Sequence, residues 1–215
     1  MILPLFLILL TSGVRSQDSC EVEVEDDAPE SEEVEVVSST YTQCSKGFQY
    51  FARTPTSKNQ KTSGWCLQLI MAQAAISQKD AENLCKAKGA QLSIFENALE
   101  QKAIFDKVPD IKTKNQFIRI DGYRKDKCKN DGAIRNDPDC RVGNAFQMKN
   151  LHTDPTYQRN NFSPGDPNYY YKDPNEHAED CLTIWSNNEK QIDNSCLATP
   201  PQGPIRGVLC GKAPG

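Results

Sequence analysis

The chain has 215 residues, of which 37% are hydrophobic and 25% charged, so its length allows one domain with extensions or at most two small domains. Its 25 lysines and arginines stand against 29 aspartates and glutamates, which gives a formal net charge of −4. This balance excludes a general nucleic-acid-binding protein, which would be strongly basic. Nine cysteines in so short a chain indicate an oxidising compartment.

The N-terminus has the pattern of a secretory signal peptide. Residues 2–10 read ILPLFLILL, and the small residues Val14 and Ser16 predict cleavage after Ser16. The apolar run is too short to span a bilayer, which argues against the alternative of a membrane anchor, and no later run approaches that length. We therefore expect residues 1–16 to be a signal peptide and the mature protein to be secreted, extracellular and without a membrane span.

An acidic segment follows at residues 17–43. It holds ten aspartates and glutamates and no lysine or arginine, whereas the body at residues 44–215 holds 19 acidic and 24 basic residues. Because like charges repel, we expect residues 17–43 to form a disordered tail. The tail is either a solubilising spacer or an electrostatic partner for a basic surface or for divalent cations.

The body begins with a predicted strand and a capped helix. Residues 65–71 read WCLQLIM, which is typical of a strand. Ser77 is suited to cap the first turn of a helix, and Asp80 places its charge near the positive end of that helix. Gly89 ends the helix, because glycine adopts the left-handed conformation at little cost.

A second helix is predicted at residues 98–107, because Asn97 and Glu100 have the spacing of a capping box. Short apolar runs predict further strands. These lie at residues 92–94, 117–120, 181–185, 191–196 and 206–210. We expect the Asp-Gly pair at residues 121–122 to end the strand that precedes it.

Residues 123–180 show little apolar periodicity and are rich in Asp, Asn, Lys, Pro and Gly. A segment of this length without regular structure is usually functional or crosslinked. Basic residues around this segment predict a positive surface. Such a surface could attract sulfated glycans or the acidic tail, and the alternative is an ordinary solvated face. These basic residues are Arg119, Arg124, Lys125, Lys127, Lys129 and Lys172.

Eight of the nine cysteines lie in the body, an even number that permits many pairings. The absence of a C-x-x-C motif and the presence of only two histidines argue against a redox site or a zinc site. We predict structural disulfides, each of which stabilises the fold by about 2–5 kcal/mol and offsets the thin core. Cys20 lies in the acidic tail and is either a free thiol or a bridge between two chains.

The order of these elements resembles the C-type lectin-like domain. The motifs KGAQLSIFENALEQ, EDCLTIW and GVLCGK flank a long loop, and FIRIDGYRKDKC is especially similar to secreted nematode members. The resemblance spans residues 44–215. It implies an α+β, disulfide-stapled fold with two helices, two small antiparallel sheets, a long loop region at one end and an N-terminal hairpin.

The resemblance also implies how the cysteines pair. One disulfide ties the first helix to the last strand, one braces the long loop, one joins the N-terminal hairpin, and the remaining pair closes a local loop. In that order the pairs are Cys85–Cys210, Cys181–Cys196, Cys44–Cys66 and Cys128–Cys140. The last three close short loops, at a low cost in chain entropy.

Calcium is the cofactor that the resemblance implies. In calcium-dependent members the ion joins the domain to two sugar hydroxyls, and the matching ligands here are Asp166, Asn168, Glu179 and Asp193, with a cis proline at position 167. Residues 173–175, Asp-Pro-Asn, are an alternative to residues 166–168.

The candidate calcium site is incomplete. Ile192 stands where the family pattern has an amide ligand, and an isoleucine offers no oxygen. Asp166 is also one methylene shorter than the usual glutamate. Calcium dependence is therefore in question, and many members of the family bind proteins or glycans at this end without calcium.

Tyr169 and Tyr170 follow the candidate ligands directly. A tyrosine combines a flat apolar face with a hydroxyl, which suits stacking on a sugar or contact with a protein. The alternative is that these tyrosines anchor the loop in a partly buried position.

The leading hypothesis is an extracellular recognition module that binds a glycan or glycoprotein through its long-loop end. The alternative is an extracellular matrix or structural protein that uses the domain as a scaffold, with roles for the acidic tail and a disulfide-linked dimer through Cys20. We expect no enzyme, because G-x-S-x-G, H-E-x-x-H and phosphate-loop motifs are absent from the sequence.

Overall fold

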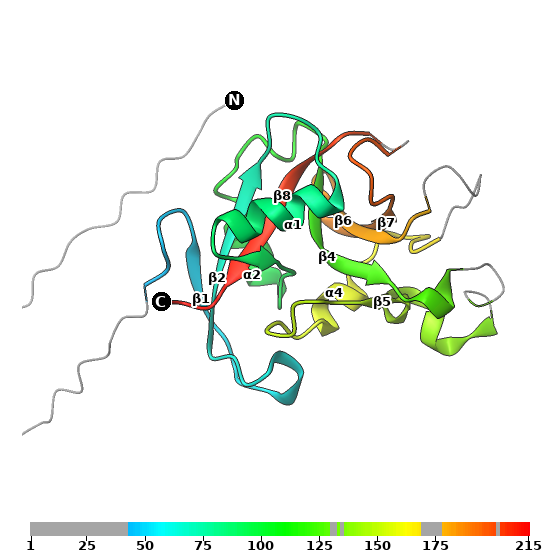
Figure 1. The fold of residues 1–215 in the computed structure, drawn as a ribbon, viewed down its shortest axis with the longest axis horizontal. Helices are drawn as coiled ribbons and strands as arrows, with labels where there is room; N and C mark the ends of the chain where they lie inside the picture. The colour runs from blue at the N-terminus through cyan, green and yellow to red at the C-terminus, as the bar shows by residue number, and fades with distance from the viewer. Residues whose placement is uncertain (1–42, 130–132, 134–135, 169–177, 201–202) are drawn as a thin grey trace, which may run out of the picture. The chain divides into compact units, whose positions relative to one another are not determined.

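The computed structural model describes residues 43–129, 133, 136–168, 178–200 and 203–215. Its helices and strands follow in chain order (Figure 1). They are β1 (Gln49–Ala52), β2 (Gly64–Met71), α1 (Gln78–Ala87), β3 (Gln91–Leu92), α2 (Ala98–Phe105), β4 (Phe117–Arg124), β5 (Phe146–Gln147), α4 (Thr156–Asn160), β6 (Cys181–Trp185), β7 (Lys190–Asn194) and β8 (Ile205–Lys212). Short 3₁₀ turns lie between some of them.

The strands form one hydrogen-bonded path in the order β1-β2-β8-β4-β6-β7. β3 pairs with β8, β5 pairs with β4, and all pairs are antiparallel except β4 with β8. The predicted α+β class is confirmed. The two expected antiparallel sheets are joined into one mixed sheet, because β4 bonds to β8 on one side and to β6 on the other.

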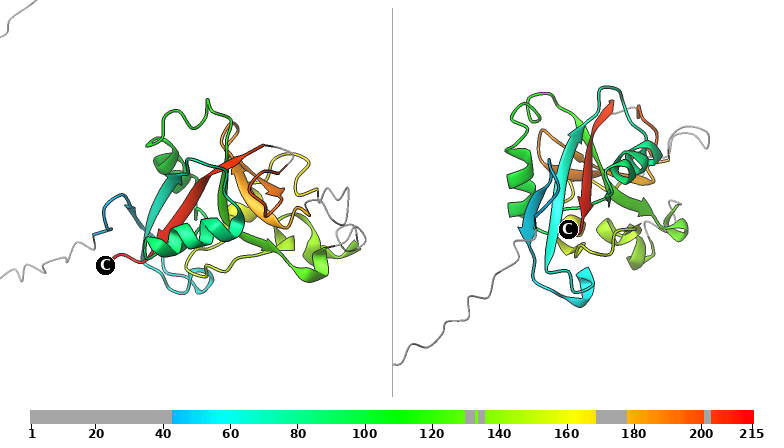
Figure 2. Two further views of the ribbon diagram at one scale, coloured as in Figure 1. Left: turned by 45° about the horizontal axis from the view of Figure 1, so that its top comes forward. Right: turned by 60° about the vertical axis from the view of Figure 1, so that its left-hand side comes forward.

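The helices α1 and α2 lie on opposite faces of the strands β2 and β8 (Figure 2). Successive side chains of a strand point to opposite faces. Leu209 of β8 accordingly packs in the core that α2 covers, whereas Val208 and Cys210 pack with Ala81 and Cys85 of α1. The apolar residues of β8 therefore serve two cores, although the chain is lean in hydrophobic residues.

Both helices begin at the predicted caps. The Ser77 side chain accepts a hydrogen bond from the Asp80 amide at 3.1 Å, and the Asn97 side chain accepts one from the Glu100 amide at 3.0 Å. The predicted capping box of α2 is only half formed. The Glu100 carboxylate is turned away from the cap and accepts hydrogen bonds from the Arg53 guanidinium and the Glu96 amide instead.

Strand β4 is longer than predicted, and the expectation that residues 121–122 end it is wrong. β4 runs on to Arg124, with a shift in register against β6 between Arg119 and Tyr123. Gly122 sits within this irregularity at φ +149°, and a Cβ there would lie 2.3 Å from the Leu182 side chain. Glycine is needed at this point for close approach between strands, not for a turn.

The four predicted disulfides are all confirmed. They join Cys44 to Cys66, Cys85 to Cys210, Cys128 to Cys140 and Cys181 to Cys196, with Cα–Cα distances between 5.1 and 5.7 Å. The second links α1 to β8 across 125 residues of sequence, and the fourth closes the β6–β7 hairpin.

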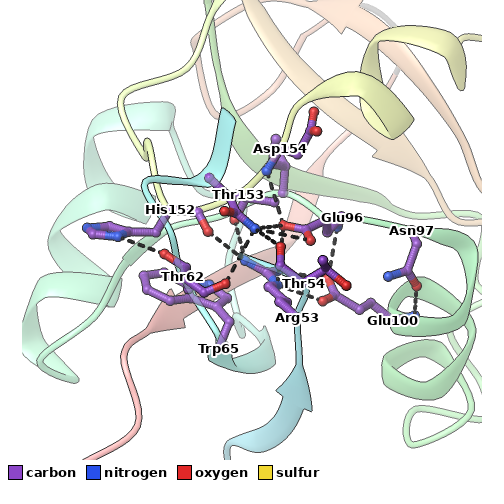
Figure 3. Close-up of polar contacts among 12 residues, drawn as sticks. Arg53, Thr54, Thr62, Trp65, Glu96, Asn97, Glu100, His152, Thr153 and Asp154 are labelled. Atoms are coloured by element: carbon purple, nitrogen blue, oxygen red, sulfur yellow. Dashed lines mark hydrogen bonds and ion pairs between the residues drawn. The ribbon is translucent and has the colours of Figure 1, made fainter. Parts of the chain in front are cut away.

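A buried ionic network ties the N-terminal hairpin to α2 and to the long loop (Figure 3). The Arg53 guanidinium donates to both carboxylate oxygens of Glu100 at 2.8 and 2.9 Å. It also donates to the His152 carbonyl at 2.9 Å and the Thr153 hydroxyl at 2.8 Å. The Trp65 ring lies beside this guanidinium and stacks on the His152 ring. Three segments far apart in sequence are thereby fixed together.

The first and last described residues of this domain lie close together. The Gly215 amide donates to the Gln43 carbonyl at 3.4 Å, beside the edge formed by β1 and β2. No helix in the described part of the chain is long and apolar enough to cross a membrane.

Candidate ligand-binding pocket at the long-loop end

Strand β7 positions the end of the long loop. Phe162 forms a parallel bridge with Gln191 of β7, and the Ser163 amide donates to the Gln191 carbonyl at 2.8 Å. A turn follows, in which the Asp166 amide donates to the Ser163 carbonyl at 3.0 Å. The peptide bond after Asp166 is cis, as the resemblance implies. Residues 166–168 are thus held against the sheet.

Three of the four predicted ligand residues, Asp166, Asn168 and Asp193, lie together, and we name them the acidic cluster. The backbone amide of Asn168 donates to Oδ1 of Asp193 at 3.2 Å, and its side-chain Nδ2 donates to Oδ1 of Asp166 at 3.0 Å. Asp193 comes from β7 and is buried. The resemblance therefore placed these residues in one site.

The acidic cluster shifts the protonation of Asp166. Burial and, to a smaller extent, the neighbouring carboxyl of Asp193 together raise the pKa of Asp166 to about 7. Near neutral pH a large fraction of Asp166 is consequently protonated. Its carboxyl then acts as a hydrogen-bond donor as well as an acceptor.

A buried arginine forms an ion pair with the Asp193 carboxylate of the acidic cluster. Arg124, at the end of β4, donates from Nη2 to Oδ2 of Asp193 at 2.5 Å and from Nε to the Glu179 carbonyl at 3.1 Å. Its guanidinium lies 4.6 Å from the centre of the Phe146 ring. The side chains of Arg124 and Asp193 are 1% and 0% exposed, so the ion pair is shielded from solvent.

A pocket of about 460 Å³ opens at the acidic cluster. Its lining includes the three cluster residues, Glu179 and the aromatic residues Phe117 and Trp185. These rings stack with their centres 6.1 Å apart. We name this cavity the loop-end pocket. It combines an aromatic wall with carboxyl and amide groups, the pattern of a site for a small polar ligand.

The residues of the acidic cluster do not fit a calcium ion. Calcium takes 6–8 oxygen ligands, yet both oxygens of Asp193 already bond to Arg124 and Asn168. Ile192 packs in a small apolar cluster and supplies no oxygen. Within the part of the chain that the structure describes, no group of three acidic, histidine or cysteine side chains is placed to hold a metal ion.

Two groups of predicted site residues have other outcomes. Tyr169 and Tyr170 lie outside the described residues, as does Lys172. The prediction that Arg119 and Arg124 belong to a positive surface is wrong, because both side chains are buried. Charge composition alone does not show on which side of the sheet a basic residue points.

Sequence reasoning missed two contributors to the site, the aromatic wall and the buried cation. A signal for Arg124 was present, because it continues the even-numbered series of Ile118 and Ile120, whose side chains lie in the core. Trp185 ends the motif EDCLTIW, and its polar edge donates to the Asn115 side chain. No local pattern marks Trp185 as pocket lining, because its partner in the wall, Phe117, comes from a distant part of the sequence.

The sequence matches a known protein family and two relatives from one species. Residues 50–213 match the family model described as C-type lectin domain-containing protein 141/158. Protein 158 of Caenorhabditis elegans is 28% identical over 130 residues, which cover 58% of this chain and 62% of the relative. Protein 141 of the same species is 29% identical over 135 residues, which cover 58% of this chain and 44% of the relative. The chain thus spans less than two thirds of either relative.

Among solved structures, the C-type lectin CEL-I from Cucumaria echinata is similar in fold, with a TM-score of 0.51 and 15% sequence identity. The match covers 80% of this chain and 99% of CEL-I. The match to the family model extends over most of the domain, from β1 to β8. On this evidence the chain belongs to the family of C-type lectin domain-containing proteins 141/158.

Proposed function

We propose that this chain is a secreted recognition module that binds a carbohydrate or glycoprotein through the loop-end pocket. The observation that carries this proposal is the pairing of the Phe117–Trp185 wall with the acidic cluster in one cavity. A sugar ring has an apolar face that stacks on an aromatic ring, and its hydroxyls bond to amide and carboxyl groups. The pocket offers both kinds of contact.

Secretion and a binding role are parts of the same proposal. Four disulfides within one domain suit an oxidising compartment outside the cell. The apolar run at residues 2–10 supports a signal peptide, and residues 17–43 are proposed as a solvated acidic tail. We assign no catalytic step to the pocket.

Binding to an immobilised glycan panel tests the proposal. The mature chain, residues 17–215, is compared with Trp185→Leu, which removes part of the aromatic wall and leaves the acidic cluster in place. We expect the wild type to bind at least one glycan and the variant to bind it at least roughly tenfold more weakly, because stacking on the indole is lost.

Tyr50→Leu is the matched control. Tyr50 is another partly exposed aromatic residue on a strand, 42% exposed, but it lies on β1 at the opposite edge of the sheet. This variant is expected to bind as the wild type does. A wild-type protein that binds no glycan or glycoprotein on the panel contradicts the proposed function, and equal losses in the two variants contradict the assignment of the pocket.

A further inference from the structure

We propose that Arg124 is a built-in cation that takes over the electrostatic role of a bound calcium ion in this domain. Its guanidinium neutralises Asp193 and holds the acidic cluster in place, so that the loop-end pocket accepts its ligand without a metal. The part that concerns the ligand rests on the proposed function, whereas the part that concerns the cation does not.

The charges of the site are arranged around Arg124. Its Nη2 bonds to Asp193 at 2.5 Å, and its Nε lies 3.9 Å from the carboxylate of Asp180, which is partly exposed. The Glu179 carbonyl accepts a further hydrogen bond. One fixed positive charge therefore faces two carboxylates and a carbonyl oxygen, a set of acceptors that elsewhere suits a hard cation.

Arginine is suited to this position in a way that lysine is not. The guanidinium remains charged when it is buried, and its planar fork bonds several acceptors at once. It is also weakly hydrated, so it tolerates the Phe146 ring, which lies 4.6 Å from it. Phe146 is itself near Phe162, with ring centres 6.1 Å apart, and Phe162 begins the segment that carries Asp166. The arginine thus connects the sheet, the core and the end of the loop.

A divalent ion and Arg124 compete for the same carboxylate. Asp193 is the one member of the acidic cluster on a strand, and its Oδ2 is committed to Arg124. Binding of calcium there would bring a double positive charge next to a guanidinium that cannot lose its proton. The buried ion pair therefore excludes the metal and at the same time orients Asp193 toward Asn168.

Thermal melting with calcium as the only added ligand tests the proposal without any variant. A ligand that binds only the folded protein raises the melting temperature. We expect the melting temperatures of the mature wild type in millimolar calcium and in excess chelator to agree within about 2 °C. A larger rise in calcium overturns the proposal.

A double-mutant cycle tests the pairing of the two charges. Arg124→Met and Asp193→Asn each leave a buried partner uncompensated, whereas the double variant leaves neither charge. We expect the double variant to melt at a higher temperature than the sum of the two single shifts predicts. If the shift in melting temperature of the double variant equals the sum of the two single shifts, the proposal is overturned. The calcium measurement on the wild type decides the question even if Arg124→Met does not fold.

The control cycle uses Lys149→Met and Glu82→Gln. This ion pair has a distance of 2.6 Å, but its side chains are 60% and 33% exposed. Solvent screens it, so its melting shifts are expected to be close to additive. Coupling as strong as that of the buried pair would show that the cycle does not report on burial and would overturn the conclusion drawn from it.

The glycan panel separates this proposal from the proposed function. Equal binding of a glycan in calcium and in chelator supports both the role of Arg124 and the proposed function. Binding that is lost in chelator overturns the role of Arg124 and leaves the proposed function standing. Absence of binding in either buffer overturns the proposed function, while the melting experiments still decide whether Arg124 replaces a metal.

Discussion

Strand β4 carries two buried charged residues, Arg119 and Asp121, on the face opposite to Ile118 and Ile120. Arg119 donates to the Leu197 carbonyl at 2.5 Å, and burial lowers its pKa to about 9. Two residues further on, Asp121 accepts a hydrogen bond from the Asn150 amide at 2.7 Å, and burial raises its pKa to about 6. Desolvation disfavours the charged form in both cases. The folded protein therefore binds a proton at Asp121 over a pH range in which the unfolded chain has lost it.

The stability of the fold is expected to depend on pH through Asp121. Because its folded pKa lies above the ordinary value of 3.8, its contribution to stability is full only below pH 3.8 and is lost as the pH rises from there through about 6. The free energy of unfolding of Asp121→Asn, taken relative to that of the wild type, is predicted to increase by up to about 3 kcal/mol between pH 4 and pH 7. Urea denaturation at the two pH values measures this difference.

Asp110→Asn is the control for this measurement, because the Asp110 side chain is 71% exposed. Its stability relative to the wild type is expected to be nearly the same at the two pH values. If Asp121→Asn also shows no change between them, Asp121 is not the group that titrates.

Some residues of the candidate site were predictable from the sequence and others were not. Asp166, Asn168 and Asp193 were found through a motif resemblance, which fixes spacing along the chain. Arg124 was assigned to the surface, because a charged residue in a polar segment carries no mark of burial by itself. Its position depends on strand alternation and on Phe146, which reaches it from another strand.

At the scale of elements, features set by local chemistry were predicted best. The starts of α1 and α2 follow from the side chains that cap them. β5 was not predicted, because a strand of two residues carries no periodicity and exists only through its pairing with β4. The continuation of β4 through Gly122 likewise depends on Leu182, a distant residue.

The ion pair between Arg53, which directly follows β1, and Glu100 of α2 carries a prediction of its own (Figure 3). Glu100→Gln removes the charge that neutralises Arg53, whose side chain is fully buried. We expect a loss of about 3–5 kcal/mol in the free energy of unfolding, because a buried charge loses its principal partner. Chemical denaturation measures it. The Glu96 carboxylate lies 3.6 Å from Arg53 Nε and still partly neutralises the guanidinium in the variant. The expected loss is therefore toward the lower end of that range.

Asp106→Asn provides the comparison on the adjoining turn. It breaks the ion pair with Lys102, whose side chains are 69% and 52% exposed. The expected change is within about 1 kcal/mol of the wild type. A similar cost for both variants would mean that burial does not set the strength of the Arg53–Glu100 interaction.

At the scale of the whole molecule, crosslinks compensate for a thin core. Eight cysteines are paired within the domain, and Cys85–Cys210 alone joins residues 125 positions apart. In the chain-entropy account, crosslinks that close long loops stabilise most, because they restrict the unfolded chain most. This disulfide also fixes α1 to β8, the strand that serves both cores.

The four disulfides account for eight of the nine cysteines in the sequence and leave Cys20, which lies outside the described residues. An odd cysteine in a secreted protein either pairs between molecules or remains a free thiol. We predict that the secreted wild type migrates as a dimer on a non-reducing gel and that Cys20→Ser migrates as a monomer. A wild type that is monomeric without reductant contradicts this prediction. Reduced samples of both proteins serve as the control.

The hydrogen bond between Gln43 and Gly215 has a practical consequence for how the pocket is presented. Both residues lie beside β1 and β2, whereas the aromatic wall and the acidic cluster belong to β4, β6, β7 and the loop beside them, toward the other edge of the sheet. A tether at either position anchors the domain by the same side. Molecules immobilised through residue 43 or residue 215 therefore display their pockets in a common orientation, which under the proposed function favours avid capture of repeated epitopes on a surface.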